Sequence, residues 1–238
     1  MGRAYEVRKA SIQKTGAAKA KLYSMYAKEI YLSAKNGGIE PEANVVLKRL
    51  IEKAKKDQVP GDLIKRAIDK VNSGADESYI SVRYEVFGPG GSTAIIDCLT
   101  DNVNRTLSGV RPALNKSGSK MGVSNSVSYM YEHLSIVSFS GLNEEQVLEA
   151  MINNNVDVID IETSEDKIIV YGHANDLYEI KEALLAVKSD LEFDSEEIVM
   201  LPKEKVKLND NDLELFNRML TILDEVEDVQ NIYHNVEL

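Results

Sequence analysis

The side chains that most often act as nucleophiles, bases and metal ligands are few in this sequence and lie far apart. Its three histidines, His133, His173 and His234, fall on different predicted elements, and their spacing matches no metal-binding motif. Cys98 lies in the apolar run 94–99, where a thiol packs as a small hydrophobic group. These residues do not assemble a nucleophile, a base and an oxyanion donor. We therefore expect no enzyme, no metal site, no cofactor and no small-molecule substrate.

Two further patterns could mark an anion or cation site. The loop Gly88-Pro89-Gly90-Gly91 follows a strand pattern, but a second strand comes after it and Pro89 lacks the N–H that a phosphate loop would donate. A hairpin turn is therefore favoured. The acidic residues between 157 and 166 lack the glycine-punctuated spacing of a calcium loop, which favours a solvated strand end.

Basic residues have the spacing that a phosphate-binding surface requires. A lysine recurs every seven positions near the start of the chain: Lys14, Lys21, Lys28 and Lys35. On a straight helix this spacing drifts by only ~20° per heptad, so the side chains project from one face. Arg3, Arg8 and Lys9 add positive charge before this row. Such a row neutralises phosphates without reading base sequence, although a solvated helix face would have the same pattern.

A second patch follows the strand that contains Cys98. Asn102, Asn104 and Arg105 stand at the start of a predicted helix, where capping amides, free backbone N–H groups and a guanidinium suit phosphate oxygens. Ordinary helix capping is the alternative interpretation. We expect Arg105 to lie beside the 88–91 turn and to form one split binding face with the lysine row. Its replacement by alanine is then expected to weaken binding with little change in melting temperature.

The apolar pattern of the first third of the chain predicts three helices. The first covers 18–35 and ends at Asn36-Gly37-Gly38, the second opens at Pro41, and the third covers about 62–71. From residue 79 the pattern alternates between strands and helices. The predicted strands are 79–87, 93–99, 127–139, 156–162, 167–171, one ending near 200, and 229–236. The predicted helices between them are 102–115, 144–153, 176–188 and 212–225.

The order of these elements predicts an α+β fold with a nested topology. Residues 140–200, with a first strand near 136–139, follow the order of a ferredoxin-like sheet. Residues 79–139 lack a final helix and strand, which 210–238 can supply. We therefore expect an N-terminal helical domain plus two ferredoxin-like α/β sandwich domains, one inserted in the other. The expected boundaries are a basic helical domain at 1–78, a discontinuous domain at 79–135 and 206–238, and an inserted acidic domain at 136–205.

Charge is strongly segregated along the 238 residues, although the net charge is −11. Residues 1–78 carry 16 Lys/Arg and 10 Asp/Glu, whereas residues 131–238 carry 7 and 26. The first 78 residues are therefore cationic, and the last 108 are strongly anionic. Such segregation of charge is typical of a protein that faces a polyanion with one surface and stays soluble through another. The chain has no apolar run of membrane-spanning length and opens without an apolar signal segment, so we expect a cytoplasmic protein with no membrane partner.

Several long segments resemble the YebC/PmpR family. They are 83–91, 98–106 and 126–132, together with Asn36-Gly37-Gly38, 41–44 and 53–60. The resemblance covers the full length and implies a helical domain and two α+β domains, the last inserted in the middle one. The opening Met1-Gly2-Arg3-Ala4-Tyr5 and the absence of Trp are similar to the YeeN-type branch. If an N-terminal Trp stacks on bases in the commoner branch, Tyr5 is the residue of this chain that could take its place.

The resemblance implies a nucleic-acid-binding regulator of gene expression without catalysis. Bacterial members are described as DNA-binding transcriptional regulators, whereas relatives that include a mitochondrial translational activator are linked to ribosomes, rRNA and relief of stalled elongation. A lysine-rich surface suits either polymer. A third hypothesis, a protein adaptor that acts through the acidic region, predicts no nucleic-acid binding. We expect the partner to be DNA or rRNA, the latter on the ribosome.

Overall fold

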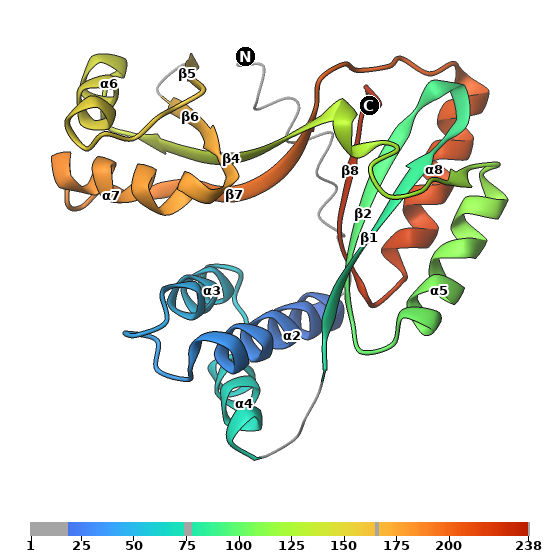
Figure 1. Ribbon diagram of the computed structural model, residues 1–238, viewed down its shortest axis with the longest axis horizontal. Helices are drawn as coiled ribbons and strands as arrows, with labels where there is room; N and C mark the ends of the chain where they lie inside the picture. Colours follow the sequence, from blue (N-terminus) through green and yellow to red (C-terminus); the bar gives the residue numbers. More distant parts are fainter. Residues whose placement is uncertain (1–18, 74–77, 165–166, 238) are drawn as a thin grey trace.

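The computed structural model describes residues 19–73, 78–164 and 167–237, which form three units (Figure 1). Helices from the N-terminal part make the first unit. The middle of the chain and its C-terminal end together make a four-stranded sheet, and a second four-stranded sheet is inserted between them. These features confirm the predicted α+β class, with a helical domain and two α/β sandwich domains, one inserted in the other.

The helical unit contains α2 (Lys19–Gly37), α3 (Val45–Lys56) and α4 (Gly61–Asn72), packed around a core that includes Ile30 and Leu47. Helix α2 ends where predicted, because Gly38 takes a left-handed backbone with φ +93°. Helix α3 does not open at Pro41. It begins four residues later, because the buried Asn44 caps it, accepting from Leu47 N and donating to the carbonyls of Ser33 and Gly38.

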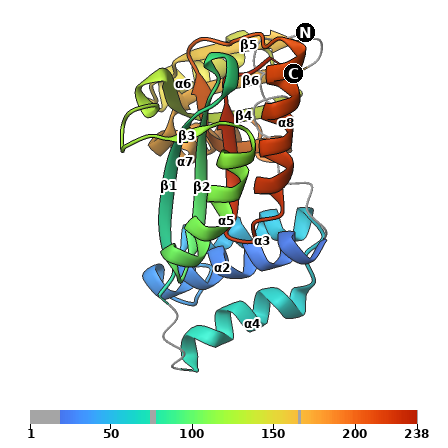
Figure 2. The same ribbon diagram turned by 90° about the vertical axis from the view of Figure 1, so that its right-hand side faces the viewer.

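The middle unit is a sheet with helices on one face. It contains β1 (Ile80–Phe87), the 3-10 turn η1 (Pro89–Gly91), β2 (Thr93–Thr100), α5 (Val103–Lys116), β3 (Lys120–Met121), α8 (Asp210–Asp224) and β8 (Val229–His234). The order is β3-β1-β2-β8, and β1, η1 and β2 form the predicted hairpin. Helices α5 and α8 pack over one face of this sheet, and α5 lies at the outer surface of the unit (Figure 2). The short β3 was not predicted.

The inserted unit contains η2 (Ser128–Met130), β4 (Tyr131–Ser140), α6 (Glu144–Asn153), β5 (Asp160–Ser164), β6 (Lys167–His173), η3 (Ala174–Asp176), α7 (Leu177–Val187) and β7 (Phe193–Pro202). The order β5-β6-β4-β7 is that of a ferredoxin-like sheet. Helices α6 and α7 cover one face of it. The opposite face packs against the middle sheet through a shared apolar cluster that includes Ile95, Tyr233, Ile136 and Val199.

The inserted unit leaves and rejoins the middle unit through two paired strands. Strand β4 starts at Tyr131, and β7 ends at Pro202, which is the register partner of Tyr131. Strand β4 begins five residues before the predicted limit at 135/136, whereas β7 ends before the one at 205/206, and those limits stay predictions. The strand predicted over 127–139 begins four residues late, because the backbone N–H groups of Val127 and Ser128, like that of Asn125, donate to Glu85 and not to a neighbouring strand.

Candidate nucleic-acid interface

The patch predicted at Asn102, Asn104 and Arg105 forms the first turn of α5. The Asn102 side chain accepts a hydrogen bond from Arg105 N at 3.1 Å, which is the geometry of an N-cap. All three residues are exposed. The helix therefore presents its N-terminal N–H groups and positive dipole end to solvent, where an anion is stabilised.

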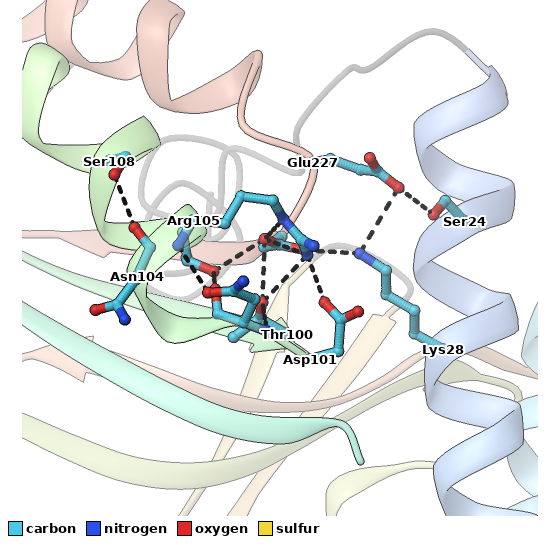
Figure 3. A network of polar contacts seen from close by, with 11 residues as sticks. Ser24, Lys28, Thr100, Asp101, Asn104, Arg105, Ser108 and Glu227 are labelled. Carbon is cyan, nitrogen blue, oxygen red and sulfur yellow. Dashed lines mark hydrogen bonds and ion pairs between the residues drawn. The ribbon is translucent and has the colours of Figure 1, made fainter. Parts of the chain in front are cut away.

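Directly behind this turn, the buried carboxylate of Asp228 binds two cationic side chains, those of Lys28 and Arg105. Asp228 lies between α8 and β8 and is only 3% exposed. Its Oδ1 accepts from Lys28 Nζ at 2.9 Å, and both of its oxygens accept from Arg105 Nη2 at 3.1 Å. Thr106 Oγ1 and Thr100 Oγ1 donate to its Oδ2 at 2.9 and 3.2 Å. Figure 3 shows Lys28 of α2, Arg105 of α5 and Thr100 at the end of β2 pointing toward one another.

The electrostatics of Asp228 follow from this geometry. Burial alone would raise the pKa of its carboxyl, but hydrogen bonds from Lys28, Thr106 and Arg105 and the charge of Lys28 outweigh it and lower that pKa. The carboxylate therefore stays ionised, and it compensates two cations that would otherwise repel each other.

Helix α2 packs its lysine face against the acidic loop around this carboxylate. Lys21 Nζ donates to the Asp224 carbonyl at 2.6 Å, and Ser24 Oγ donates to Glu227 Oε1 at 2.9 Å. Lys28 Nζ is also 3.7 Å from Glu227 Oε1. Burial is the main reason that the pKa of Lys21 is lowered, and the negative charge of Asp224 opposes it. The seven-residue spacing thus places Lys21 and Lys28 on one face, as predicted, but that face joins two units of the protein.

Three expectations need correction. Lys28 is not an exposed phosphate ligand, because it is 8% exposed and bound to Asp228. Arg105 is not only a binding residue, because its side chain also stabilises the fold. It donates to Asp228 and, at 2.6 Å, to Asp101 Oδ1, although the side chain is 54% exposed. The alanine variant of Arg105 is therefore expected to lose stability as well as any binding.

The third correction concerns the glycine turn. The 88–91 turn and Arg105 stand at opposite ends of β2, roughly 23 Å apart along an eight-residue strand. The turn instead packs against the start of α8: a Cβ at Gly90, where φ is +62°, would lie 2.7 Å from Leu208 and 2.8 Å from Asp212. The turn therefore does not lie beside Arg105, contrary to the expectation.

The remaining predicted residues fall into two groups. Lys35 is exposed near the far end of α2, with its Nζ 5.9 Å from the centre of the Tyr31 ring. Four basic residues lie outside the described part of the chain: Arg3, Arg8, Lys9 and Lys14. They are joined through residue 18 to Lys19, which is exposed at the start of α2 and only two residues before Lys21.

Sequence reasoning missed a polar stripe along α5. Its members are exposed and follow the helical spacing i, i+4, i+7 and i+11: Asn104, Ser108, Arg111 and Asn115. Ser108 Oγ donates to the Asn104 carbonyl at 2.8 Å. The same spacing rule that finds apolar stripes could have found this one, had polar residues been counted.

Cys98 is buried, 3% exposed, inside β2. Burial raises the pKa of its thiol to about 12, so at pH 8 roughly one thiol in 10⁴ is ionised. We expect an alkylating reagent at pH 8 to label the native protein at least ~100-fold more slowly than the unfolded protein. Labelling followed by mass spectrometry, with and without denaturant, measures the ratio. Equal rates would mean that the thiol is reactive in the native fold.

The described residues contain neither a metal-binding cluster nor a membrane-spanning helix. Across 19–73, 78–164 and 167–237, His, Cys, Asp and Glu side chains form no group of three or more that could hold a metal ion. Within the same residues, no helix combines the length and the apolar character that crossing a membrane requires.

The overall fold of the chain has a solved representative. A conserved hypothetical protein from Aquifex aeolicus superposes with a TM-score of 0.77 at 32% identity, covering 97% of this chain and 95% of that one. Residues 3–74 match the TACO1/YebC N-terminal domain, and residues 79–236 match the TACO1/YebC second and third domain. The chain belongs to the TACO1/YebC family, as its sequence resemblance predicted.

Curated relatives extend this similarity over the whole chain. A probable transcriptional regulatory protein of Vibrio parahaemolyticus is 48% identical over 238 residues, covering 100% of both chains. One of Marinobacter nauticus is also 48% identical, covering 100% of this chain and 99% of the relative. The relatives are therefore similar in every unit of the fold, including the inserted one.

Proposed function

We propose that this protein is a non-enzymatic regulator of transcription that binds DNA through the exposed face of α5. The observation that carries the proposal is the stripe Asn104, Ser108, Arg111 and Asn115, which presents amide and guanidinium groups along a surface helix. Arg pairs with guanine and Asn with adenine in the major groove, which is wide enough to admit a helix. The names of the curated relatives support the same function.

The N-terminal turn of α5 would bind phosphates beside that groove. Its backbone N–H groups, Asn102 and the exposed part of Arg105 provide the donors. The basic residues before Lys19 are attached close to this turn, since Lys21 contacts the loop that ends at Asp228. In this arrangement the basic residues before Lys19, called the arm below, and the start of α5 would bind one stretch of DNA backbone.

The placement of acidic groups limits where DNA can lie. The inserted unit, with most of the acidic excess, stands on the far side of the molecule from the start of α5 (Figure 1). The loop 224–228 is acidic and lies next to the patch, but Lys28 and Arg105 compensate its most buried carboxylate. The phosphates therefore contact α5 and the arm, and avoid the inserted unit.

A substitution at the second position of α5 tests this interface. Asn104→Asp adds a negative charge where it stabilises a helix N-terminus, so the fold is retained, but the charge repels phosphate. We expect binding to a mixed-sequence 24-base-pair duplex to weaken by about 3- to 10-fold in 0.1 M salt, measured by fluorescence anisotropy.

The matched control is Asn211→Asp, at the same position of α8, beside the glycine turn and away from the proposed interface. It is expected to bind DNA like the wild type. Equal affinity of both variants for DNA contradicts the proposal. A parallel titration with ribosomes separates the alternative function: a loss at Asn104→Asp confined to ribosomes would assign this face to rRNA.

A further inference from the structure

One segment of this acidic chain contains no acidic residue. Residues 102–131, which cover α5, β3 and the loop before β4, carry neither Asp nor Glu but four basic residues: Arg105, Arg111, Lys116 and Lys120. The polar stripe of α5 ends at Asn115, and the remainder of the segment continues from that end of the helix into the edge strand β3 (Figure 2). A polyanion that follows α5 therefore meets no carboxylate from this segment.

Two exposed aromatic rings border the loop that follows β3. Tyr129, in η2, is 63% exposed, and Phe87, the last residue of β1, is 40% exposed. A Cβ on Gly122 would lie 3.0 Å from Phe87 Cε2, so the ring of Phe87 lies against the start of the loop. Lys120 is exposed and is the register partner of Phe87. Two rings and an ammonium group are thus attached to one short stretch of the surface.

Hydrogen bonds order the backbone that carries Tyr129. The buried carboxylate of Glu85 accepts three backbone N–H groups between Asn125 and Ser128. Val127 is buried beside this carboxylate, whereas Tyr129 is exposed to solvent two residues later. An aromatic ring on an ordered backbone loses little conformational entropy when it binds a ligand.

Exposed rings beside cations suit an unpaired base. In a duplex, the neighbouring bases cover both faces of each base, so a protein ring stacks on a base only where the strand is single. The phosphates of such a strand need cations, and Lys116 and Lys120 are exposed on either side of the turn at Gly118. An apolar protein surface would match the rings, but it would leave these ammonium groups without a counter-charge.

We propose that residues 116–130, called the aromatic loop below, bind a single-stranded segment of nucleic acid together with Phe87. Its bases stack on Tyr129 and Phe87, and its phosphates contact Lys116 and Lys120. The inference rests on the proposed function for the class of ligand, and it adds an unpaired strand at the C-terminal end of α5. A duplex that binds only along α5 would have no use for exposed rings at this end of the helix.

The experiment uses the full chain and three fluorescein-labelled DNA probes: a mixed-sequence 12-nucleotide single strand, the same strand with abasic sites at its central positions, and the 12-base-pair duplex. Tyr129→Leu keeps an apolar side chain but removes the ring. By fluorescence anisotropy in 0.1 M salt, we expect it to bind the intact strand about 5- to 30-fold more weakly than the wild type, the effect of one lost stacking contact. Its affinity for the abasic strand and for the duplex should be unchanged, and Tyr129→Phe should bind all three probes like the wild type.

The matched control is Tyr178→Leu, which removes an exposed tyrosine from α7 of the inserted unit and should bind like the wild type. Equal affinity of the wild type and Tyr129→Leu for the intact strand would overturn the inference, and so would equal affinity of the wild type for the intact and abasic strands. An RNA strand of the same sequence is titrated in parallel. Binding of either polymer supports the inference, and the tighter complex identifies which sugar the site prefers.

The phosphate contacts have a separate readout. Replacing Lys116 and Lys120 together by glutamine should reduce the slope of log affinity against log salt by about 1.4 for the single strand, about 0.7 for each lost contact. An unchanged slope would contradict these contacts. The proposed duplex binding is tested at the other end of α5 by Asn104→Asp. A loss of duplex affinity there, with no loss of single-strand affinity in Tyr129→Leu, would keep the proposed function and overturn this inference alone.

Discussion

Asp228→Asn is expected to lower the free energy of unfolding by about 3 kcal/mol, because it removes the charge that compensates Lys28 and Arg105. Lys28 is the more costly partner, since it is buried and would keep only the exposed Glu227, 3.7 Å away, as a counter-charge. The hydrogen bonds from Thr100 and Thr106 would also weaken. Urea denaturation followed by circular dichroism measures the change.

The control for this variant is Asp101→Asn, which removes the exposed partner of Arg105. Exposed ion pairs contribute about 0–1 kcal/mol, so its effect should be small. Similar losses in the two variants would show that Asp228 is not the centre of the contact. Increased amide exchange in α2 is expected only for Asp228→Asn, because that helix reaches the middle unit through Lys21, Ser24 and Lys28.

The same carboxylate predicts a pH dependence. Its pKa is lower in the folded protein than in the unfolded chain, where an Asp titrates near ~3.9. The stability from Asp228 is therefore fully present above the unfolded pKa and is lost as pH falls through the lower folded pKa. The difference in unfolding free energy between wild type and Asp228→Asn should be constant from pH 5 to 7 and shrink toward pH 3.

Glu85→Gln is expected to lower the free energy of unfolding by about 3–4 kcal/mol, because several charge-assisted hydrogen bonds to the carboxylate are lost or weakened. Glu85 is 5% exposed, and its carboxylate accepts from Asn125 N, Val127 N and Ser128 N at 2.5–2.8 Å and from Ser128 Oγ at 2.7 Å. Burial alone would raise the pKa of this carboxyl, but these hydrogen bonds lower it. A glutamine offers one acceptor oxygen, and its NH₂ group would face N–H donors.

Hydrogen exchange should locate the damage. The amides of Val127 and Ser128 are expected to lose protection in Glu85→Gln, whereas those in α6 and α7 keep theirs. Glu132→Gln, at an exposed position on β4, is the control and should change stability by less than ~0.5 kcal/mol. Intact protection at Val127 in a folded Glu85→Gln protein would contradict this account of the 125–128 loop.

Local signals predicted most helices well. Helix α6 matches its predicted range, because Asn143 and Gln146 form a capping box that is legible in the sequence. Helix α3 was misplaced because a proline at a helix start and a proline in a turn have the same local pattern, and the deciding contact is between Asn44 and the end of α2. Strand β3 was missed because a strand of two residues is too short to show an alternating pattern of apolar and polar side chains.

The candidate site was predictable only in part. Capping residues located the first turn of α5, and heptad spacing located the lysine face of α2. What these residues contact was not predictable, because Asp228 is 200 positions from Lys28 and 123 from Arg105. The spacing of residues along a helix predicts which side chains share a face. It does not predict which acidic residue, distant in the sequence, packs against that face.

The pairing of Tyr131 with Pro202 affects the conformational entropy of the chain that connects the two parts of the middle unit. While the inserted unit is folded, this pair closes the chain between β3 and α8 to the length of a short loop. If the insert unfolded alone, the connection between β3 and α8 would lengthen from roughly 18 to roughly 88 residues, at an added entropic cost of about 1.4 kcal/mol. The inserted unit therefore stabilises the middle sheet through chain connectivity, in addition to the side chains that it packs against that sheet.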